Sequence, residues 1–170
     1  MRFVPILVLL ICCLTACSTA PGTNGDYTIY LVRHAEKQAD GSRDPELTEA
    51  GKRRSENLAE WIADKNIRDV WSSDYKRTRD TAKPALSRLG LDLIIYDPRD
   101  LAALSETLLS NRRNALVVGH SNTTPDLARL LCECEIDDMD DSEYNRLLVI
   151  SVTNGKPHAN TIQQQAKHFD

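Results

Sequence analysis

The sequence predicts a three-layer α/β domain, in which a mostly parallel sheet is flanked by helices and has an antiparallel C-terminal edge. From residue 27 to residue 131, short β-branched and aromatic runs alternate with amphipathic stretches, as in parallel sheets covered by helices. Only Asn154-Gly155 separates the last two strand-like runs, and this pair favours a tight hairpin turn. We therefore expect one domain over residues 26–170.

The first half of this domain should contain two strands, each followed by a helix. The expected strands cover residues 27–32 and 70–72, and the expected helices residues 48–64 and 75–89. Thr48 is a suitable N-cap for the first helix, and Gly90 is suited to end the second. Pro84 lies inside the second helical pattern, so we expect a kink or an early stop there.

The second half continues the alternation and then changes to a hairpin. The expected strands cover residues 91–96, 115–118, 147–152 and 158–164, and the expected helices residues 100–109 and 125–131. An acidic segment, residues 137–143, should form a loop between the last helix and the hairpin.

The N-terminal segment is expected to be a signal rather than part of the domain. Residues 1–16 contain one cation, Arg2, followed by an apolar stretch that is too short to span a bilayer. The sequence Leu-Thr-Ala-Cys that ends at Cys17 resembles the bacterial lipobox, which implies cleavage before Cys17 and its lipidation. Residues 17–25 would then be a flexible tether to the membrane. The alternative is an ordinary cleaved signal in which Cys17 has no role.

The charge distribution argues against nucleic acid as a partner. The formal net charge is −4, and the sequence contains neither a basic block nor a basic stripe with interleaved aromatic residues.

Two of the five cysteines, Cys132 and Cys134, lie outside the predicted signal and lipid site. A Cys-x-Cys pair can bind metal or form a strained disulfide in an oxidising compartment. Because no second ligand cluster accompanies it, we interpret the pair as two small, half-buried thiols.

Polar side chains follow three of the expected strands at the points where these strands end. The pairs are Arg33-His34, Ser72-Ser73 leading to Lys76-Arg77, and Gly119-His120. Ligands of such sheets bind beyond the carboxyl ends of the strands. If the three strands are parallel neighbours, these groups meet on one rim of the sheet.

Two imidazoles and two guanidinium groups around one cavity favour an anion site. Arginine presents a planar fork that matches phosphate oxygens, and histidine offers a nucleophilic nitrogen at neutral pH. A metal site is the alternative. It is disfavoured because Arg33 and Arg77 would repel a divalent cation, and because the sequence contains no His-x-x-x-His motif or dense carboxylate cluster nearby.

Four segments together resemble the histidine phosphatase superfamily, also called phosphoglycerate mutase-like. Residues 31–36 (LVRHAE) resemble its Arg-His-Gly motif, with Ala35 in place of the usual glycine. Residues 47–51 (LTEAG) resemble its Leu-Thr-x-x-Gly helix start, and residues 72–82 its Ser-x-x-x-Arg-x-x-x-Thr-Ala segment. Residues 117–121 (VVGHS) match the second histidine motif, and the four segments occur in the family order.

The resemblance implies a fold, a mechanism and site residues. His34 would be the nucleophile that becomes phosphorylated, Arg33 and Arg77 would hold the phosphoryl oxygens, and His120 would complete the pocket. The spacing assigns the second arginine to Arg77 rather than Arg79. Water would hydrolyse the phosphohistidine, and neither a metal nor another cofactor would be required.

Larger family members also use a carboxylate as general acid, supplied between the second arginine and the second histidine. Asp97 and Asp100 follow the expected strand at residues 91–96 and are the candidates. The compact branch that resembles phosphohistidine protein phosphatases lacks this acid, and Asp97 is equally suited to a turn or cap ahead of Pro98. Glu36 and Lys37, beside the first histidine motif, are interpreted as a solvated ion pair.

The sequence thus favours a metal-independent phosphatase that hydrolyses phosphomonoesters. The expected substrates are a phosphorylated small molecule, an envelope glycan or a phosphoprotein. The lipid anchor would hold the enzyme at the periplasmic face of a membrane in the bacterial cell envelope. The alternative is a non-catalytic envelope lipoprotein that binds phosphorylated ligands in the same pocket.

Overall fold

The structure is a computed structural model that describes residues 25–164. The predicted signal peptide at residues 1–16, Cys17 and all but the last residue of the predicted tether lie outside the described residues. Within residues 25–164, no helix is long and apolar enough to cross a membrane.

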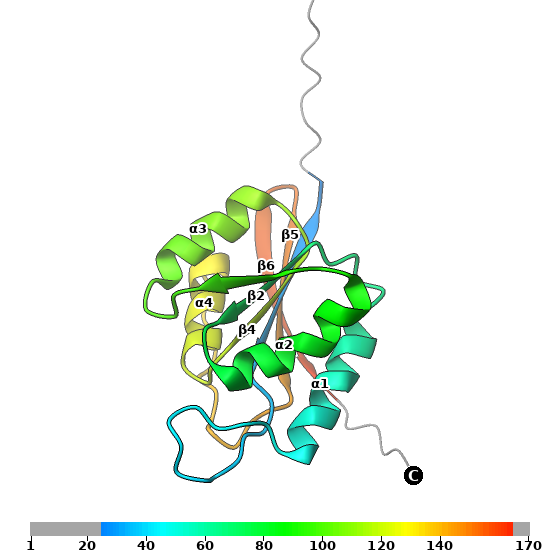
Figure 1. Cartoon of the computed structure of the whole chain (residues 1–170). Coiled ribbons are helices and arrows are strands. Elements are labelled where there is room, and N and C mark those ends of the chain that lie inside the picture. The colour runs from blue at the N-terminus through cyan, green and yellow to red at the C-terminus, as the bar shows by residue number, and fades with distance from the viewer. Residues whose placement is uncertain (1–24, 165–170) are drawn as a thin grey trace, which may run out of the picture.

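Six strands form one mixed sheet in the order β3-β2-β4-β1-β5-β6 (Figure 1). Their bounds are Tyr27–Arg33 for β1, Asp69–Ser73 for β2, Leu93–Tyr96 for β3, Ala115–Gly119 for β4, Arg146–Thr153 for β5 and Lys156–Gln163 for β6. Strands β1 to β4 run parallel, whereas β5 is antiparallel to β1 and β6 is antiparallel to β5. The predicted parallel sheet with an antiparallel C-terminal edge is confirmed.

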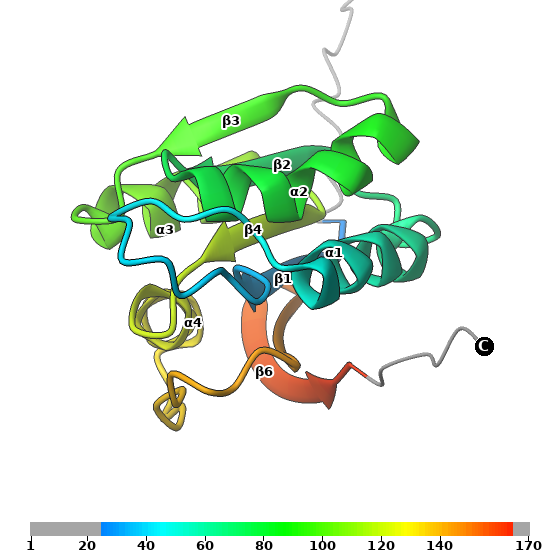
Figure 2. The same ribbon diagram turned by 60° about the horizontal axis from the view of Figure 1, so that its bottom comes forward.

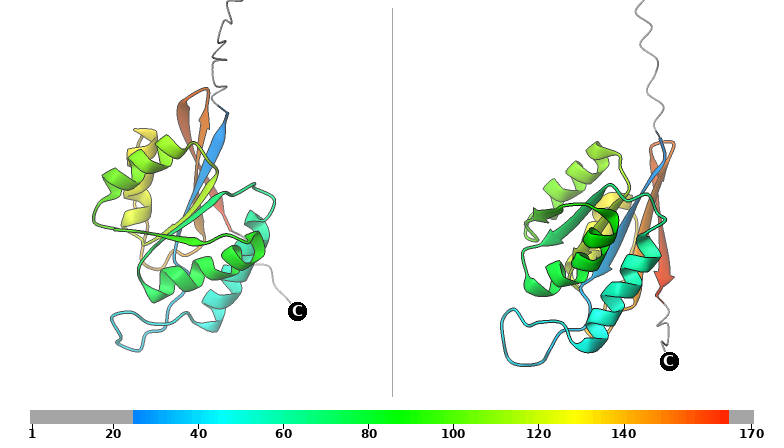
Figure 3. Two further views of the ribbon diagram at one scale, coloured as in Figure 1. Left: turned by 45° about the horizontal axis from the view of Figure 1, so that its top comes forward. Right: turned by 45° about the vertical axis from the view of Figure 1, so that its right-hand side comes forward.

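Four helices cover the two faces of this sheet (Figure 2, Figure 3). They are α1 (Glu49–Ile62), α2 (Lys76–Leu89), α3 (Leu101–Asn111) and α4 (Thr123–Cys132). Successive residues of β1 point to opposite faces: Ile29 and Leu31 pack in the apolar cluster under α3 and α4, and Tyr30 and Val32 in the cluster under α1 and α2. Both faces are buried, and the central strand β4 (ALVVG) accordingly has no polar side chain.

Local sequence signals explain where the first two helices begin and end. The Thr48 hydroxyl accepts a hydrogen bond from the Gly51 amide at 3.1 Å and caps α1. Gly90 has φ +66° and ends α2 in the left-handed conformation. The expected early stop at Pro84 is wrong, because α2 continues to Leu89. Pro84 removes one backbone hydrogen bond of the helix. Burial of Ala82 and Ala85 against the core keeps the helix intact at this point.

The state of the cysteine pair differs from the prediction, which was two small, half-buried thiols. Cys132, the last residue of α4, forms a disulfide with Cys134. Glu133, between them, has φ +52°, and this turn brings the two Cα atoms to 5.1 Å, within the usual range for a disulfide. The prediction of two thiols was therefore wrong. The backbone turn that brings the two cysteines together depends on how α4 ends.

Candidate active site

The polar ends of β1, β2 and β4 meet, as their parallel pairing requires. Arg33 pairs in register with Gly119, and the neighbouring β2 leads into α2. The four predicted residues Arg33, His34, Arg77 and His120 line one open cavity of about 500 Å³. This arrangement brings two guanidinium groups and two imidazoles to one rim.

His34 lies at the floor of this cavity and is only 3% exposed. Its backbone amide donates to the Gly119 carbonyl at 2.9 Å, which anchors it to the end of β4. Its Nδ1 lies 2.8 Å from the Ala35 carbonyl oxygen, and a carbonyl only accepts, so the proton is on Nδ1 and the lone pair on Nε2.

The surroundings of His34 keep its imidazole neutral. Burial lowers the pKa of His34 to about 3, against the opposing effect of the hydrogen bond to Ala35. The nearby Arg33, Arg77 and His120 lower this pKa further, because a second positive charge beside them is unfavourable. At neutral pH, Nε2 is thus an unprotonated nitrogen in a cationic pocket.

Arg33 is held mainly by backbone carbonyls rather than by a close carboxylate. Its Nη1 donates to the carbonyls of Asp140, Asp141 and Glu143 at 3.2, 2.7 and 3.2 Å. Its guanidinium carbon lies 4.1 Å from the ring centroid of Tyr144. Its Nε is buried without a hydrogen-bond partner.

Arg77 and His120 line the same cavity and contact each other. Nη2 of Arg77 lies 3.4 Å from Nδ1 of His120, and the other ring nitrogen, Nε2, lies 2.9 Å from the Ser73 hydroxyl oxygen. Because arginine only donates, Nδ1 of His120 accepts and Nε2 carries the proton. Burial, then the charges of Arg77 and Arg33, lower the pKa of His120 to about 4. The Nε of Arg77 is also buried without a partner.

The start of α4 adds a further preference for anions. Asn122 and Thr123 line the cavity at the N-terminal end of this helix, where the helix dipole favours negative charge. A Cβ at Gly119 would lie 2.9 Å from both the Thr123 Oγ1 and the Tyr96 hydroxyl oxygen. Only glycine therefore lets β4 approach α4 this closely.

Comparison with known proteins agrees with this geometry. The family model for the histidine phosphatase superfamily (branch 1) matches residues 29–99. The chain is therefore similar to the histidine phosphatase superfamily over this segment, which contains His34 and Arg77. Its match to "Probable phosphoglycerate mutase GpmB" of Yersinia pestis is 37% identical over 90 residues, and the same holds for the protein of that name from Yersinia pseudotuberculosis. These matches cover 49% of this chain and only 41% of each relative.

Solved structures of phosphatases share the superfamily fold over a larger part of the chain. The tungstate complex of the protein histidine phosphatase SixA has a TM-score of 0.69 and 20% identity, covering 80% of this chain and 96% of SixA. The mycobacterial glucosyl-3-phosphoglycerate phosphatase has a TM-score of 0.67 and 15% identity, covering 84% of this chain and 100% of that protein. At these identities the comparison shows a common fold.

The superfamily's helix-start motif packs against its first histidine motif. A Cβ at Gly51 would lie 2.2 Å from the Glu36 carbonyl oxygen, so α1 can begin here only with glycine. The Glu36 carboxylate accepts from Nε and Nη2 of Arg54 at 2.6 to 3.0 Å. The predicted Glu36–Lys37 ion pair is wrong, because Glu36 turns toward α1, whereas Lys37 lines the cavity.

The two candidate acids are engaged elsewhere. Asp97 accepts from Nε and Nη2 of Arg99 at 2.9 and 2.7 Å, and hydrogen bonds from the Arg99 side chain and backbone lower the pKa of Asp97 to about 2. Asp100 accepts from the Ala103 amide at 3.1 Å and caps α3. Neither carboxyl lines the cavity, so both match the turn and cap alternative.

Sequence reasoning missed the cavity residues supplied by the acidic loop. Asp141 and Tyr144 line the cavity, and the Ser121 hydroxyl donates to Oδ1 of Asp141 at 2.6 Å. The acidic composition of residues 137–143 identified a loop but gave no sign that it returns to the site. In the described part of the chain, no group of three or more histidine, cysteine or acidic side chains is arranged to hold a metal ion.

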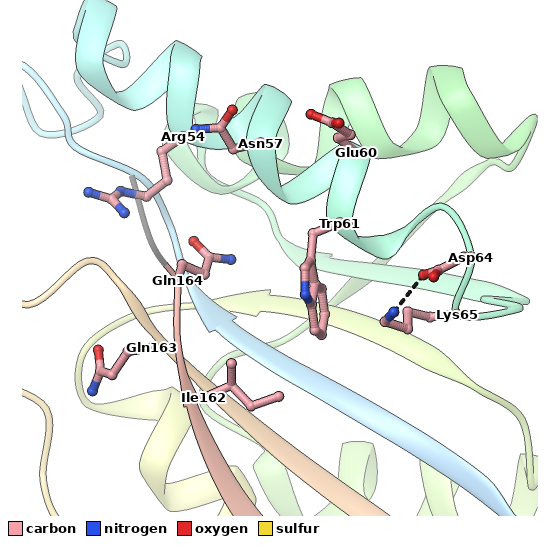
Figure 4. A pocket seen from close by; sticks show the side chains of 9 residues that line it. All are labelled: Arg54, Asn57, Glu60, Trp61, Asp64, Lys65, Ile162, Gln163 and Gln164. Atoms are coloured by element: carbon pink, nitrogen blue, oxygen red, sulfur yellow. Dashed lines mark hydrogen bonds and ion pairs between the residues drawn. The ribbon is translucent and has the colours of Figure 1, made fainter. Parts of the chain in front are cut away.

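A second cavity, of about 460 Å³, lies between α1 and β6. Trp61 points from α1 toward Ile162 of β6 (Figure 4) and packs edge to face on Tyr30, with a centroid distance of 5.6 Å. Asn57 and Gln164 also line this cavity, which contains neither of the two site histidines.

Proposed function

We propose that this chain is a phosphatase that hydrolyses phosphomonoesters through a phosphohistidine intermediate on His34. The observation that carries the proposal is the free lone pair on Nε2 of His34 in a cavity that Arg33 and Arg77 also line. Similarity to the superfamily supports a phosphatase or mutase type of activity. The phosphatases among the structural neighbours favour hydrolysis over mutase chemistry.

In the proposed first step, Arg33 and Arg77 bind the phosphoryl oxygens and Nε2 of His34 attacks phosphorus. The Ala35 carbonyl stabilises the positive charge that develops on the ring, through its hydrogen bond from Nδ1. The guanidinium groups stabilise the negative charge on the equatorial oxygens. Water then attacks the phosphohistidine and releases inorganic phosphate.

We propose that the reaction needs no metal ion. Fixed guanidinium charges face the positions of the equatorial oxygens, which is the electrostatic role that metal ions have in other phosphoryl-transfer enzymes. Activity should therefore persist in excess chelator.

We also propose that the enzyme is a lipoprotein of the bacterial envelope, anchored through Cys17 and facing the periplasm. The Cys132–Cys134 disulfide supports an oxidising compartment. The open cavity is compatible with a phosphorylated small molecule, an envelope glycan or a phosphoprotein as substrate. Cys17→Ser should abolish lipid labelling and membrane fractionation, and unchanged fractionation would exclude this anchor.

The decisive experiment measures phosphate release from p-nitrophenyl phosphate with EDTA present, and trapping of acid-labile phosphate on His34. His34→Ala should lose both, and undiminished activity would eliminate His34 as nucleophile. The alternative, a phosphate-binding lipoprotein, predicts saturable phosphate binding without turnover or a labelled histidine. In that case Arg77→Ala should still remove the binding.

A further inference from the structure

We infer that Asp141 is the proton donor to the leaving-group oxygen in this reaction, an inference that rests on the proposed phosphatase activity. A phosphomonoester with an alkyl leaving group needs such a donor, because an alkoxide leaves slowly without a proton. Asp97 and Asp100, the acids expected from the sequence, are bound to Arg99 and to the start of α3.

Among the described residues that line the cavity, Asp141 is the one carboxylic acid. It belongs to the segment between α4 and β5, far in sequence from both histidine motifs. The same residue also takes part in holding Arg33, because its backbone carbonyl accepts from Nη1 of Arg33 at 2.7 Å. The loop conformation that holds Arg33 therefore also determines the position of the Asp141 backbone, from which its side chain extends.

The in-line geometry of phosphoryl transfer puts the leaving oxygen on the side of Asp141. The attacking and leaving atoms lie on opposite sides of phosphorus. His34 is buried at the floor, so the leaving group must point toward the open mouth of the cavity. The Asp141 side chain is 88% exposed while still lining the cavity, which is the position of a group at that mouth.

Contacts on both sides orient the carboxyl. The Ser121 hydroxyl donates to its Oδ1 at 2.6 Å, and Nη2 of Arg33 lies 3.6 Å from the same oxygen. Oδ2 remains to carry the proton.

The proton and the bonds balance over the two steps. In the first, the bond from His34 Nε2 to phosphorus forms, the bond from phosphorus to the ester oxygen breaks, and that oxygen takes the proton of Asp141. In the second, the Asp141 carboxylate takes a proton from water as the water oxygen attacks phosphorus and the bond to Nε2 breaks. Alcohol and inorganic phosphate are released, and both residues return to their first state.

This assignment narrows the substrate class. An acid matters for esters whose leaving group is a poor one, such as the alkoxide of a sugar or glycerol, and matters little for aryl esters or phosphohistidine. The natural substrate is accordingly an alkyl phosphomonoester, which includes phosphorylated sugars and glycans.

The test compares two leaving groups in the full-length protein purified in detergent. Asp141→Asn keeps the size of the side chain and an oxygen that accepts from Ser121, but removes the acidic proton. With glycerol 2-phosphate, kcat/KM should fall roughly 10² to 10³-fold; with p-nitrophenyl phosphate, whose phenolate leaves unaided, it should change less than about threefold. Asp137→Asn, in the same loop, is the charge control and should match the wild type on both substrates.

The outcomes separate this inference from the proposed function. Equal losses on both substrates, or no loss with glycerol 2-phosphate, would overturn the role of Asp141 while leaving the phosphatase intact. An inactive wild type, or full activity in His34→Ala, would overturn the proposed function and the inference with it. Circular dichroism spectra that match the wild type would show that Asp141→Asn is folded.

Discussion

Acid should destabilise this protein through His34. An unfolded histidine has a pKa of about 6.5, whereas burial and the neighbouring cations lower the pKa of His34 to about 3 in the folded protein. Between these values the unfolded chain binds one more proton at this residue, so stability falls as the pH falls below 6.5. The loss is about 1.4 kcal/mol per pH unit, or about 3 kcal/mol at pH 4.5.

The measurement is urea unfolding of the wild type and His34→Asn at pH 7 and pH 4.5. The asparagine amide can still donate to the Ala35 carbonyl but does not titrate, so the variant should lose about 3 kcal/mol less than the wild type over this interval. Carboxylates that also weaken in acid cancel in this difference. His158→Asn, in β6, is the matched control and should lose as much as the wild type. Equal losses in the wild type and His34→Asn would refute a neutral, buried His34.

The remaining predictions concern binding, packing and catalysis. Arg77→Ala should bind inorganic phosphate roughly 10- to 150-fold more weakly by calorimetry, because a charged hydrogen bond of about 1.5 to 3 kcal/mol is lost; an unchanged Kd would contradict its role. Gly119→Ala should lower the free energy of unfolding by about 1 to 3 kcal/mol because its Cβ has no space, whereas Gly25→Ala, where nothing lies within 4 Å, should not. Because the pKa of His34 is about 3, this nucleophile is already unprotonated at pH 5, so aryl phosphatase activity should persist there; loss of activity with an apparent pKa near 6.5 would contradict this.

The fold was predictable because its signals are local. The β-branched and aromatic run of β1, the Thr48 cap and the Gly90 stop each depend on a few neighbouring residues, and each occurs where it was expected. The meeting of Arg33, Arg77 and His120 followed from one topological assumption, that their strands are parallel neighbours. The alternation of strand and helix patterns in the sequence was sufficient to make that assumption.

Other features depend on packing between segments that are distant in sequence, and these were not predictable. Glu36 binds Arg54 because α1 packs on the segment after β1, so the adjacent Lys37 is not its partner. The acidic composition of residues 137–143 is typical of any solvated loop. Asp141 lines the cavity of His34 because of the path that the chain takes between the end of α4 and the start of β5.

The loop also explains how an acidic chain keeps a cationic pocket. Carboxylates in direct contact with Arg33 would neutralise its charge and compete with phosphate. Instead, three neutral carbonyl dipoles saturate Nη1, and the Asp141 carboxylate is 3.6 Å from Nη2 and bound to Ser121. The guanidinium is thus fixed while its Nε remains unpartnered. The loop backbone is what orients the cation, so the negative sequence of the loop and the positive charge of the site are compatible.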